Sequence, residues 1–379
     1  MSQKSSEMKA QGIDVINMSV GEPDFMTPDH IKEAGKKAID DNYSKYSPVP
    51  GYMDLRKAIS EKLAKENNLS YSAKEIIVGT GGKQGVCNAI LALVNPGDEV
   101  IIPAPYWVSY PQMVKLAGGT PVTLRTPLES DFKLTPEQLE AAITPKTKML
   151  IICSPSNPTG SVYTQDELNA LAEVVKKHDD MYVLSDEIYE HINYVGFKAS
   201  IAAAPDMKDR TIICNGVSKA YAMTGWRLGW VAAPEWIIKG MNKLQGQYTS
   251  GTNDVAQRAA LAAYKGDQQC VEDMRVAFQR RRDLIVKLAK EIPGLEVNVP
   301  QGAFYLFPHC KKLFGKSYGD YTINTSTDFA MYLLQEAHVA TVAGDAFGEP
   351  DGFRMSYATS DDNIREALRR IKEACEKLK

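Results

Sequence analysis

The sequence predicts an α/β protein with a mainly parallel, doubly wound sheet in a large domain and a second, smaller α+β domain. Between residues 75 and 234, short apolar runs rich in β-branched residues alternate with segments of helical length. Continuous apolar runs of this kind are typical of strands that are buried on both faces of a parallel sheet. After residue 234 the pattern becomes helical and then mixed, which predicts a separate unit. A chain of 379 residues is long enough to form both.

Seven apolar runs are the expected strands, and they read EIIVGT, EVIIPAP, TPVTLRT, MLIICSPSNP, MYVLSDEI, TIICNGVSK and RLGWVAAP. Two helix starts between them pair a hydroxyl residue with Gln or Glu three residues later, at Thr135 with Gln138 and at Thr164 with Glu167. Such pairs satisfy backbone N–H groups that have no helical partner. Strand and helix signals therefore alternate as a doubly wound domain requires.

The C-terminal part predicts a long helical region to about residue 290, then the strand-like segments QGAFYLF and FRMSYA, and finally a helix. Apolar residues recur in this last helix at helical spacing, at Ile364, Ala367, Leu368, Ile371 and Ala374. We expect residues 31–285 to form the large domain and residues 286–379 the small domain. Residues 1–30 are expected to belong to the small domain.

Charge and composition exclude several classes of function. The chain has 44 Lys and Arg against 47 Asp and Glu, so it carries no basic footprint for nucleic acid or for a membrane surface. It has no apolar tract of membrane-spanning length, and its N-terminus lacks the apolar core of a signal peptide. We expect a cytoplasmic protein whose partners are small molecules or copies of itself. The triple Arg280-Arg281-Arg282 is more typical of a solvated or salt-bridged helix face than of an anion site.

Neither metal nor thiol chemistry is expected. The six cysteines are scattered without a C-x-x-C pair, and the five histidines are isolated. Cys153 and Cys214 lie in strand-like apolar runs and are predicted to be reduced core residues.

A glycine-rich segment, Gly79 to Gly82, lies between an expected strand and an expected helix. It is neither a dinucleotide fingerprint nor a P-loop, because Gln84 stands where the first needs glycine and where the second needs Ser or Thr. Its bare backbone amides and the helix dipole could still bind an anion. A plain glycine turn is the alternative interpretation.

The most specific motif is SKAYAMTGWR, which runs from Ser218 to Arg227 directly after an apolar strand. A lysine at a strand end can be desolvated enough to be a nucleophilic amine, and Ser218 and Arg227 could bind a phosphate. An ordinary exposed lysine is the alternative. The spacing S-K-x-x-x-x-x-G-x-R resembles the cofactor-lysine signature of class I aminotransferases, which use pyridoxal 5'-phosphate.

The resemblance continues, in order, across essentially the whole chain. The matching segments are VGEPDFMTP at 20–28, KYSPVPGYMDLRKAI at 45–59, PAPYWVSYP at 103–111, SPSNPTG at 154–160, SDEIYE at 185–190 and FRMSYA at 353–358. They are most similar to the bacterial aspartate aminotransferase branch of the fold type I enzymes, some members of which accept prephenate. The large domain would then be the cofactor-binding one.

The resemblance implies a role for each matching position. Lys219 would hold the cofactor as a Schiff base and then move the proton as general acid and base, while Asp186 would pair with the pyridine nitrogen. Asn157 and Tyr189 would hydrogen-bond the phenolic oxygen, and Trp107 would stack on the ring. Trp107 and Asn157 would also contact the substrate. By residue type alone, Asp186 and Trp107 could be ordinary core residues.

Four further positions would form the phosphate cup: Gly81, Gly82, Ser218 and Arg227. Arg354 would grip the substrate's α-carboxylate with two parallel hydrogen bonds, where an isolated exposed arginine is the alternative. Gly21 would bring backbone close to the same carboxylate. Phe304 would lie near the substrate or be an ordinary buried strand residue. Tyr46 would reach the phosphate of a neighbouring subunit, which implies a homodimer with shared active sites.

Two departures from the family pattern bear on specificity. The stretch 244–257 contains no arginine, whereas enterobacterial and animal aspartate enzymes bind the distal carboxylate through an arginine there. In the branch resembled here a lysine in the G-G-K-Q turn serves instead, and Lys83 occupies that position. Only 19 residues precede Val20, fewer than the branch usually has, and the leader helps to cover its active site.

The resemblance therefore predicts an aspartate aminotransferase that forms oxaloacetate and L-glutamate from L-aspartate and 2-oxoglutarate by a ping-pong route. A prephenate or aromatic aminotransferase and a C-S lyase on the same fold are the alternative enzymes. A regulatory module that senses the cofactor is the alternative outside enzymes, but regulators of that kind carry an added DNA-binding domain for which this chain has neither room nor basic charge.

Overall fold

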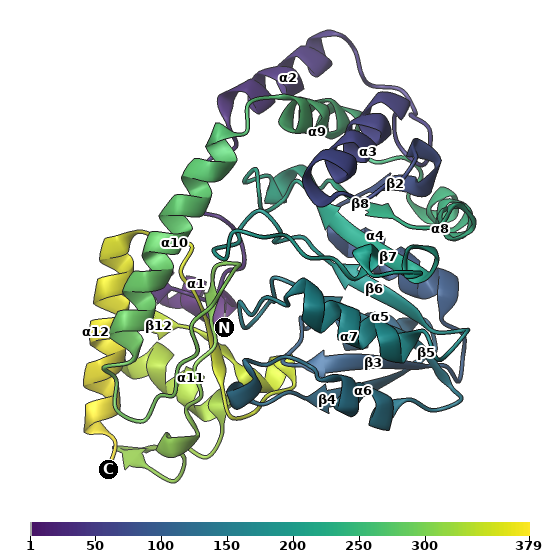
Figure 1. Ribbon diagram of the computed structural model, residues 1–379. Helices are drawn as coiled ribbons and strands as arrows, with labels where there is room; N and C mark the ends of the chain where they lie inside the picture. Colours follow the sequence, from purple (N-terminus) through teal and green to yellow (C-terminus); the bar gives the residue numbers. More distant parts are fainter. Residues whose placement is uncertain (1) are drawn as a thin grey trace.

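A computed structural model describes residues 2–379 and contains two units joined by a long helix (Figure 1). The larger unit is built on a seven-stranded sheet with the order β2-β8-β7-β6-β5-β3-β4. Its strands are β2 (Ile76–Gly79), β3 (Glu99–Ala104), β4 (Thr120–Arg125), β5 (Thr147–Cys153), β6 (Tyr182–Asp186), β7 (Thr211–Gly216) and β8 (Gly229–Ala232). Each of the seven predicted apolar runs overlaps one of them, and six runs contain their strand entirely, whereas β5 begins two residues before its run.

Strand direction in this sheet is mainly parallel, as predicted. Strands β4, β3, β5, β6 and β7 pair in parallel, whereas β8 runs antiparallel to both β7 and β2. Every residue of β2, β7 and β8 is buried. The edge strand β4, by contrast, contains only half-buried and exposed residues.

Helices cover both faces of the sheet and use alternate strand residues to do so. In β5, Met149 and Ile151 pack with the helices α4, α5 and α8, whereas Leu150 and Ile152 pack on the opposite face with α6 and α7. The helices of this unit are α2 (Asp29–Asp40), α3 (Met53–Asn67), α4 (Gly82–Leu93), α5 (Tyr110–Leu116), α6 (Pro136–Ala142), α7 (Gln165–Val175), α8 (Glu235–Tyr248) and α9 (Asp254–Lys265).

Local capping fixes where two of these helices begin. The hydroxyl of Thr135 accepts from the backbone N–H of Gln138, and that of Thr164 accepts from Glu167, with the reciprocal side-chain bonds also present. Both predicted capping boxes are confirmed. Each cap of this kind stabilises its helix by about 1 kcal/mol.

The smaller unit combines the C-terminal segment with the beginning of the chain. Strand β1 (Ile16–Asn17) pairs in parallel with β12 (Val339–Ala340), so residues near both ends meet in one sheet. A second sheet has the order β13-β14-β9, with β13 at Val342–Ala343, β14 at Phe353–Ser356 and β9 at Tyr305–Leu306. The other elements are α1 (Ser2–Ala10), β10 (Ser317–Tyr318), β11 (Tyr321–Thr322), α11 (Ser326–Glu336) and α12 (Asp361–Lys377).

The joining helix α10 (Gln269–Ala289) runs from beside α2 and α9 down to the smaller unit, where it packs on α12 (Figure 1). Its three consecutive arginines are salt-bridged or hydrogen-bonded, as predicted. Arg281 is nevertheless buried rather than solvated, and its guanidinium forms two bonds of 2.7 and 3.0 Å to Asp24. The expected domain boundary at 285/286 falls inside this helix and stays a prediction.

The six cysteines are free thiols. Cys214 is buried in the sheet, as predicted for a core residue. Cys153 departs from the prediction: it ends β5 and lines the large cavity described below, because the carboxyl ends of parallel strands open toward that cavity.

Candidate active site

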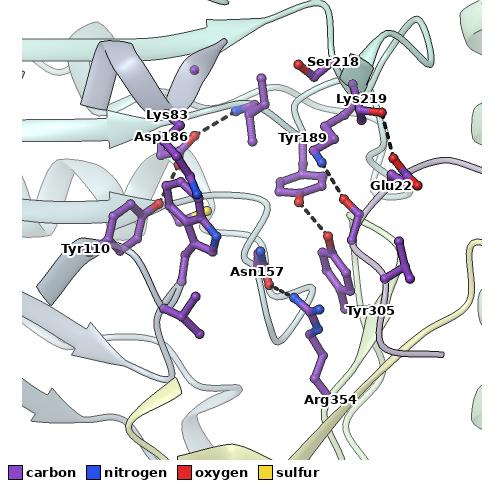
Figure 2. Close-up of a pocket in the computed structure, with 18 of the residues that line it drawn as sticks. Glu22, Lys83, Tyr110, Asn157, Asp186, Tyr189, Ser218, Lys219, Tyr305 and Arg354 are labelled. Atoms are coloured by element: carbon purple, nitrogen blue, oxygen red, sulfur yellow. Dashed lines mark hydrogen bonds between the residues drawn. The ribbon is translucent and has the colours of Figure 1, made fainter. Parts of the chain in front are cut away.

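A cavity of about 530 Å³ lies where the carboxyl ends of the parallel strands face the smaller unit. Doubly wound sheets bind their ligands at this edge. Eleven residues singled out from the sequence line it: Gly21, Gly82, Lys83, Trp107, Asn157, Asp186, Tyr189, Ser218, Lys219, Arg227 and Arg354. They come from segments that are far apart in the sequence, and Figure 2 shows several of them converging on one space.

One end of the cavity is suited to an anion. Helix α4 begins after Gly81, whose φ of +79° favours glycine, and the first turn of a helix has N–H groups without a helical partner. A Cβ on Gly81 would lie 2.5 Å from Nη2 of Arg227. Together with the Ser218 hydroxyl, these groups form a cradle that could hold a phosphate.

Lys219 follows the buried strand β7 and is half-buried. Its Nζ donates to the backbone carbonyl of Gly21 at 2.6 Å. Burial, and then the positive charge of Arg354, lower the pKa of Lys219 to about 8. An amine in this environment is largely neutral at mildly alkaline pH and can act as a nucleophile.

Asp186 is the last residue of β6 and is buried. Its carboxylate accepts from the Tyr110 hydroxyl at 2.6 Å and from the backbone N–H of Ile188 at 3.3 Å. Burial raises the pKa of Asp186, although the bond from Tyr110 acts in the opposite direction. Within the part of the chain that the structure describes, no cation contacts this carboxylate directly, and a cationic ring nitrogen beside it would be stabilised.

Arg354 in β14 is also buried, but only part of its hydrogen-bonding capacity is used. Nη1 donates to Oδ1 of Asn157 at 2.8 Å, and Nη2 donates to the Ser19 carbonyl at 2.7 Å. The Nε group has no hydrogen-bond partner within residues 2–379. A buried guanidinium with free donors that lines a cavity is well suited to a carboxylate.

Two tyrosines form a pair on the adjacent wall. The hydroxyls of Tyr189 and Tyr305 lie 2.8 Å apart, and the guanidinium of Arg354 lies 4.5 Å from the centre of the Tyr305 ring (Figure 2). Phe304, which was singled out from the sequence, is fully buried behind this pair, and the cavity lining includes Tyr305 in its place. The Phe304 ring is still 5.9 Å from Nζ of Lys219.

Lys83 reaches the cavity from the first turn of α4. Its Nζ lies over the Trp107 ring, 5.0 Å from the ring centre. Glu22, which the sequence did not single out, lies on the opposite side beside Lys219, and its carboxylate accepts from the Thr224 hydroxyl at 2.9 Å. The cavity therefore carries both cationic and anionic side chains.

Tyr46 lies outside this cavity. Its side chain is fully exposed, in a separate surface hollow formed with residues 251–254. No group of His, Cys, Asp and Glu side chains able to hold a metal ion occurs within residues 2–379.

The profile of the family described as aminotransferase class I and II matches residues 13–371. The chain belongs to this family. It is 52% identical over 375 residues to an aspartate/prephenate aminotransferase of Cereibacter sphaeroides, covering 98% of this chain and 94% of that protein. The crystal structure of an aspartate aminotransferase from Rhizobium meliloti matches with a TM-score of 0.97 and 46% identity, covering 100% of this chain and 95% of that one.

A third comparison is with the aspartate aminotransferase of Thermus thermophilus determined with maleate. Its TM-score is 0.92 and its identity 41%, with coverage of 98% of this chain and 95% of that chain. These matches confirm the predicted class I aminotransferase fold and the transaminase class of the enzyme. Class I aminotransferases use pyridoxal phosphate.

Sequence reasoning missed Tyr305, Tyr110 and Glu22 in this aminotransferase site. Tyr110 and Glu22 stand inside segments that carried the family resemblance, so their proximity to the cavity could have been suspected. No sequence pattern marked Tyr305 as a cavity residue. Both faces of the strand-like segment FYLF carry large apolar or aromatic side chains, so strand periodicity does not predict which ring faces the cavity.

Proposed function

We propose that this aminotransferase binds pyridoxal 5'-phosphate in the cavity and links it to Lys219. The Gly81 cradle with Ser218 and Arg227 fits the phosphate, and the buried Asp186 carboxylate fits a cationic ring nitrogen. When bound, pyridoxal phosphate supplies an aldehyde carbon that links to amines and a ring that accepts the electron pair released at the substrate Cα.

The protein residues would divide the remaining tasks. The Lys219 amine, with its lowered pKa, is suited to take a proton from the substrate Cα and to return it. Asp186 keeps a negative charge next to the ring nitrogen, and Tyr110 holds that carboxylate in place. Tyr189 and Asn157 supply hydroxyl and amide donors on the wall between Lys219 and Arg354.

We further propose that the reaction transfers the amino group of L-aspartate to 2-oxoglutarate and yields oxaloacetate and L-glutamate. The observation that carries this substrate class is that two cations, Lys83 and Arg354, line one cavity from different units of the protein. Arg354 would bind the α-carboxylate and Lys83 the distal one. Arg258, which lies just beyond the arginine-free stretch, is occupied by two bonds to Asp54 of 2.6 and 2.8 Å.

A second acceptor, prephenate, is favoured by the names of the similar proteins. The relatives from Cereibacter sphaeroides and Rhizobium leguminosarum are named aspartate/prephenate and probable aspartate/prephenate aminotransferase, at 52% and 51% identity. An aromatic aminotransferase or a C-S lyase has less support, because Lys83 and Arg354 together favour a dicarboxylate.

A panel of donors and acceptors tests these proposals. The cofactor-loaded protein would be assayed with aspartate, glutamate, phenylalanine and alanine as donors, and with 2-oxoglutarate, oxaloacetate and prephenate as acceptors. We expect aspartate and glutamate to give the highest kcat/KM among the donors. A preference for phenylalanine would contradict dicarboxylate specificity, and release of ammonia with pyruvate would indicate a lyase.

We also propose a homodimer in which Tyr46 reaches the phosphate of the partner's site. A fully exposed tyrosine outside its own chain's cavity supports this arrangement.

The domain division at residues 30 and 285 and a cytoplasmic location are two further proposals. Limited proteolysis tests the first, and cell fractionation tests the second. Within residues 2–379, no helix is long and apolar enough to cross a membrane.

A further inference from the structure

Arg125 links the two units of the protein at a point outside the active-site cavity. It is the last residue of the edge strand β4, and its side chain is about half exposed. Its Nε and Nη2 donate to the two carboxylate oxygens of Glu349 at 2.7 and 2.6 Å, and Nη2 also contacts Asp351. Paired guanidinium–carboxylate bonds of this kind fix orientation as well as distance.

The partners of Arg125 lie in a tight turn of the smaller unit, residues 344–352. Glu349 is fully buried. A Cβ on Gly344 would come within 2.0 Å of the Glu349 carbonyl oxygen, so the two arms of the turn are in direct contact. A turn packed this closely transmits a displacement of one arm to the other.

The same turn forms part of the cavity wall. The Phe347 ring lines the cavity and lies 5.0 Å from the guanidinium of Arg354, the proposed ligand of the α-carboxylate. The Phe347 carbonyl accepts from the backbone N–H of Tyr106 at 3.0 Å, and Tyr106 directly precedes Trp107. Contacts of the turn therefore reach both Arg354 and the large-unit segment that carries the cavity tryptophan.

We propose that Arg125 is a positioning residue that clamps the 344–352 turn to the large unit and so holds Arg354 in place for the substrate's α-carboxylate. This inference rests on the proposed role of Arg354. Arg125 is not among the residues that line the cavity, so it acts through Glu349, Asp351 and Phe347 rather than by touching the substrate.

The charges around the turn make Arg125 difficult to replace. Besides Arg125, the Glu349 carboxylate has two weaker neighbours within residues 2–379: the backbone N–H of Asp351 at 3.2 Å and Nε2 of His309 at 4.0 Å. Burial lowers the pKa of His309, which keeps its ring neutral near pH 7. Lys311 pairs with Asp351 at 3.0 Å but belongs to the same unit as the turn, so it cannot hold the turn to the sheet.

The test compares Arg125→Gln with the matched variant Lys311→Gln in the cofactor-loaded enzyme. We expect Arg125→Gln to lower kcat/KM by about tenfold or more, mainly through KM, for aspartate and for alanine alike, because every donor has an α-carboxylate. Lys311→Gln, which removes the other cation on Asp351, should leave KM within about twofold of the parent value. Arg125→Lys should recover part of the loss.

A double-variant cycle with Phe347→Leu separates positioning from general destabilisation. If Arg125 acts through the turn, the two effects on KM should not add. Additive effects, or an unchanged KM with a lower unfolding temperature only, would overturn the inference. Failure of the proposed function differs from this outcome, because the parent enzyme itself would then fail to transfer the amino group of aspartate.

Discussion

At the residue scale, Lys219 combines the properties that the proposed chemistry requires. It is half-buried, it follows a strand end, and its Nζ donates to the Gly21 carbonyl. The motif around Lys219 could be recognised in the sequence, because its spacing of Ser, Lys, Gly and Arg is specific. Asp186 and Arg354 were found in the same way. Their burial and their hydrogen-bond partners depend on contacts between distant segments, which spacing does not encode.

The first prediction concerns the pH dependence of Lys219. Covalent attachment of pyridoxal phosphate to the cofactor-free protein requires the neutral amine, so its rate should rise as pH increases through about 8. Stopped-flow absorbance across a pH series measures this rate. In Arg354→Gln the midpoint should move to higher pH, because a positive charge that lowers the pKa of Lys219 is removed. A midpoint near the ordinary lysine value in the parent protein would contradict the effect of burial.

The second prediction concerns Lys83. Lys83→Ala should lower kcat/KM for aspartate and glutamate by about ten- to a hundredfold, since a charge-assisted hydrogen bond contributes roughly 1.5–3 kcal/mol. Alanine and phenylalanine, which lack the distal carboxylate, should be spared. Steady-state kinetics on the four donors measures the difference. An equal loss for all four would make Lys83 a cofactor residue instead.

At the element scale, the loop that carries Tyr189 is tied to helix α3 by a buried ion pair. Lys62 in α3 contacts Glu190, and both side chains are almost fully buried. Asn215, near the end of β7, donates to the same carboxylate at 2.6 Å. Burial raises the pKa of Glu190, but the positive charges of Lys62 and its neighbours lower this pKa by a larger amount. The carboxylate therefore stays ionised. This network joins the loop that carries Tyr189 to the strand that precedes Lys219.

The third prediction tests that ion pair. Lys62→Met should reduce the free energy of unfolding by about 3–5 kcal/mol, because it leaves the buried Glu190 charge without its cationic partner. The double variant Lys62→Met/Glu190→Gln should recover much of the loss. Lys37→Met, which removes an exposed pair with Asp41, should cost under about 1 kcal/mol. Urea unfolding gives all three values, and a Lys62→Met variant as stable as the parent would show that Glu190 is neutral in the folded protein.

Element positions were more predictable than element directions. Apolar runs marked all seven strands of the large sheet. Six of these strands are largely buried and therefore apolar throughout, whereas the edge strand β4 has no fully buried residue. No sequence feature indicates that β8 runs antiparallel, since its composition resembles that of the parallel strands beside it. Arg281 illustrates a further limit: its burial against Asp24 brings together residues 257 positions apart.

At the scale of the whole molecule, the cavity depends on both units and, in our proposal, on a second copy of the chain. Arg354 and Phe347 come from the smaller unit, whereas Lys219 and Asp186 come from the large sheet. The cavity between the units is thus formed by residues from several segments of the chain. Tyr46, exposed on the surface, would complete the site of the partner.

The fourth prediction tests this sharing. Mixing Lys219→Ala chains with Tyr46→Ala chains, after dissociation and reassociation, should restore activity at roughly one quarter of the sites, because half of the dimers are mixed and each has one intact site. Lys219→Ala mixed with Asp186→Ala is the control, and it should restore nothing, since both residues line the cavity of one chain. No gain over the separate Tyr46→Ala chains, or an active monomer by gel filtration, would contradict shared sites.

The most direct test of the proposed transamination is a single half-reaction on the cofactor-loaded protein. L-Aspartate added without an acceptor should release oxaloacetate equimolar with the active sites and then stop, because the amino group stays on the protein-bound cofactor. Addition of 2-oxoglutarate should then release an equal amount of L-glutamate, and Lys219→Ala should do neither. Continued turnover without an acceptor, or full activity of Lys219→Ala, would contradict it.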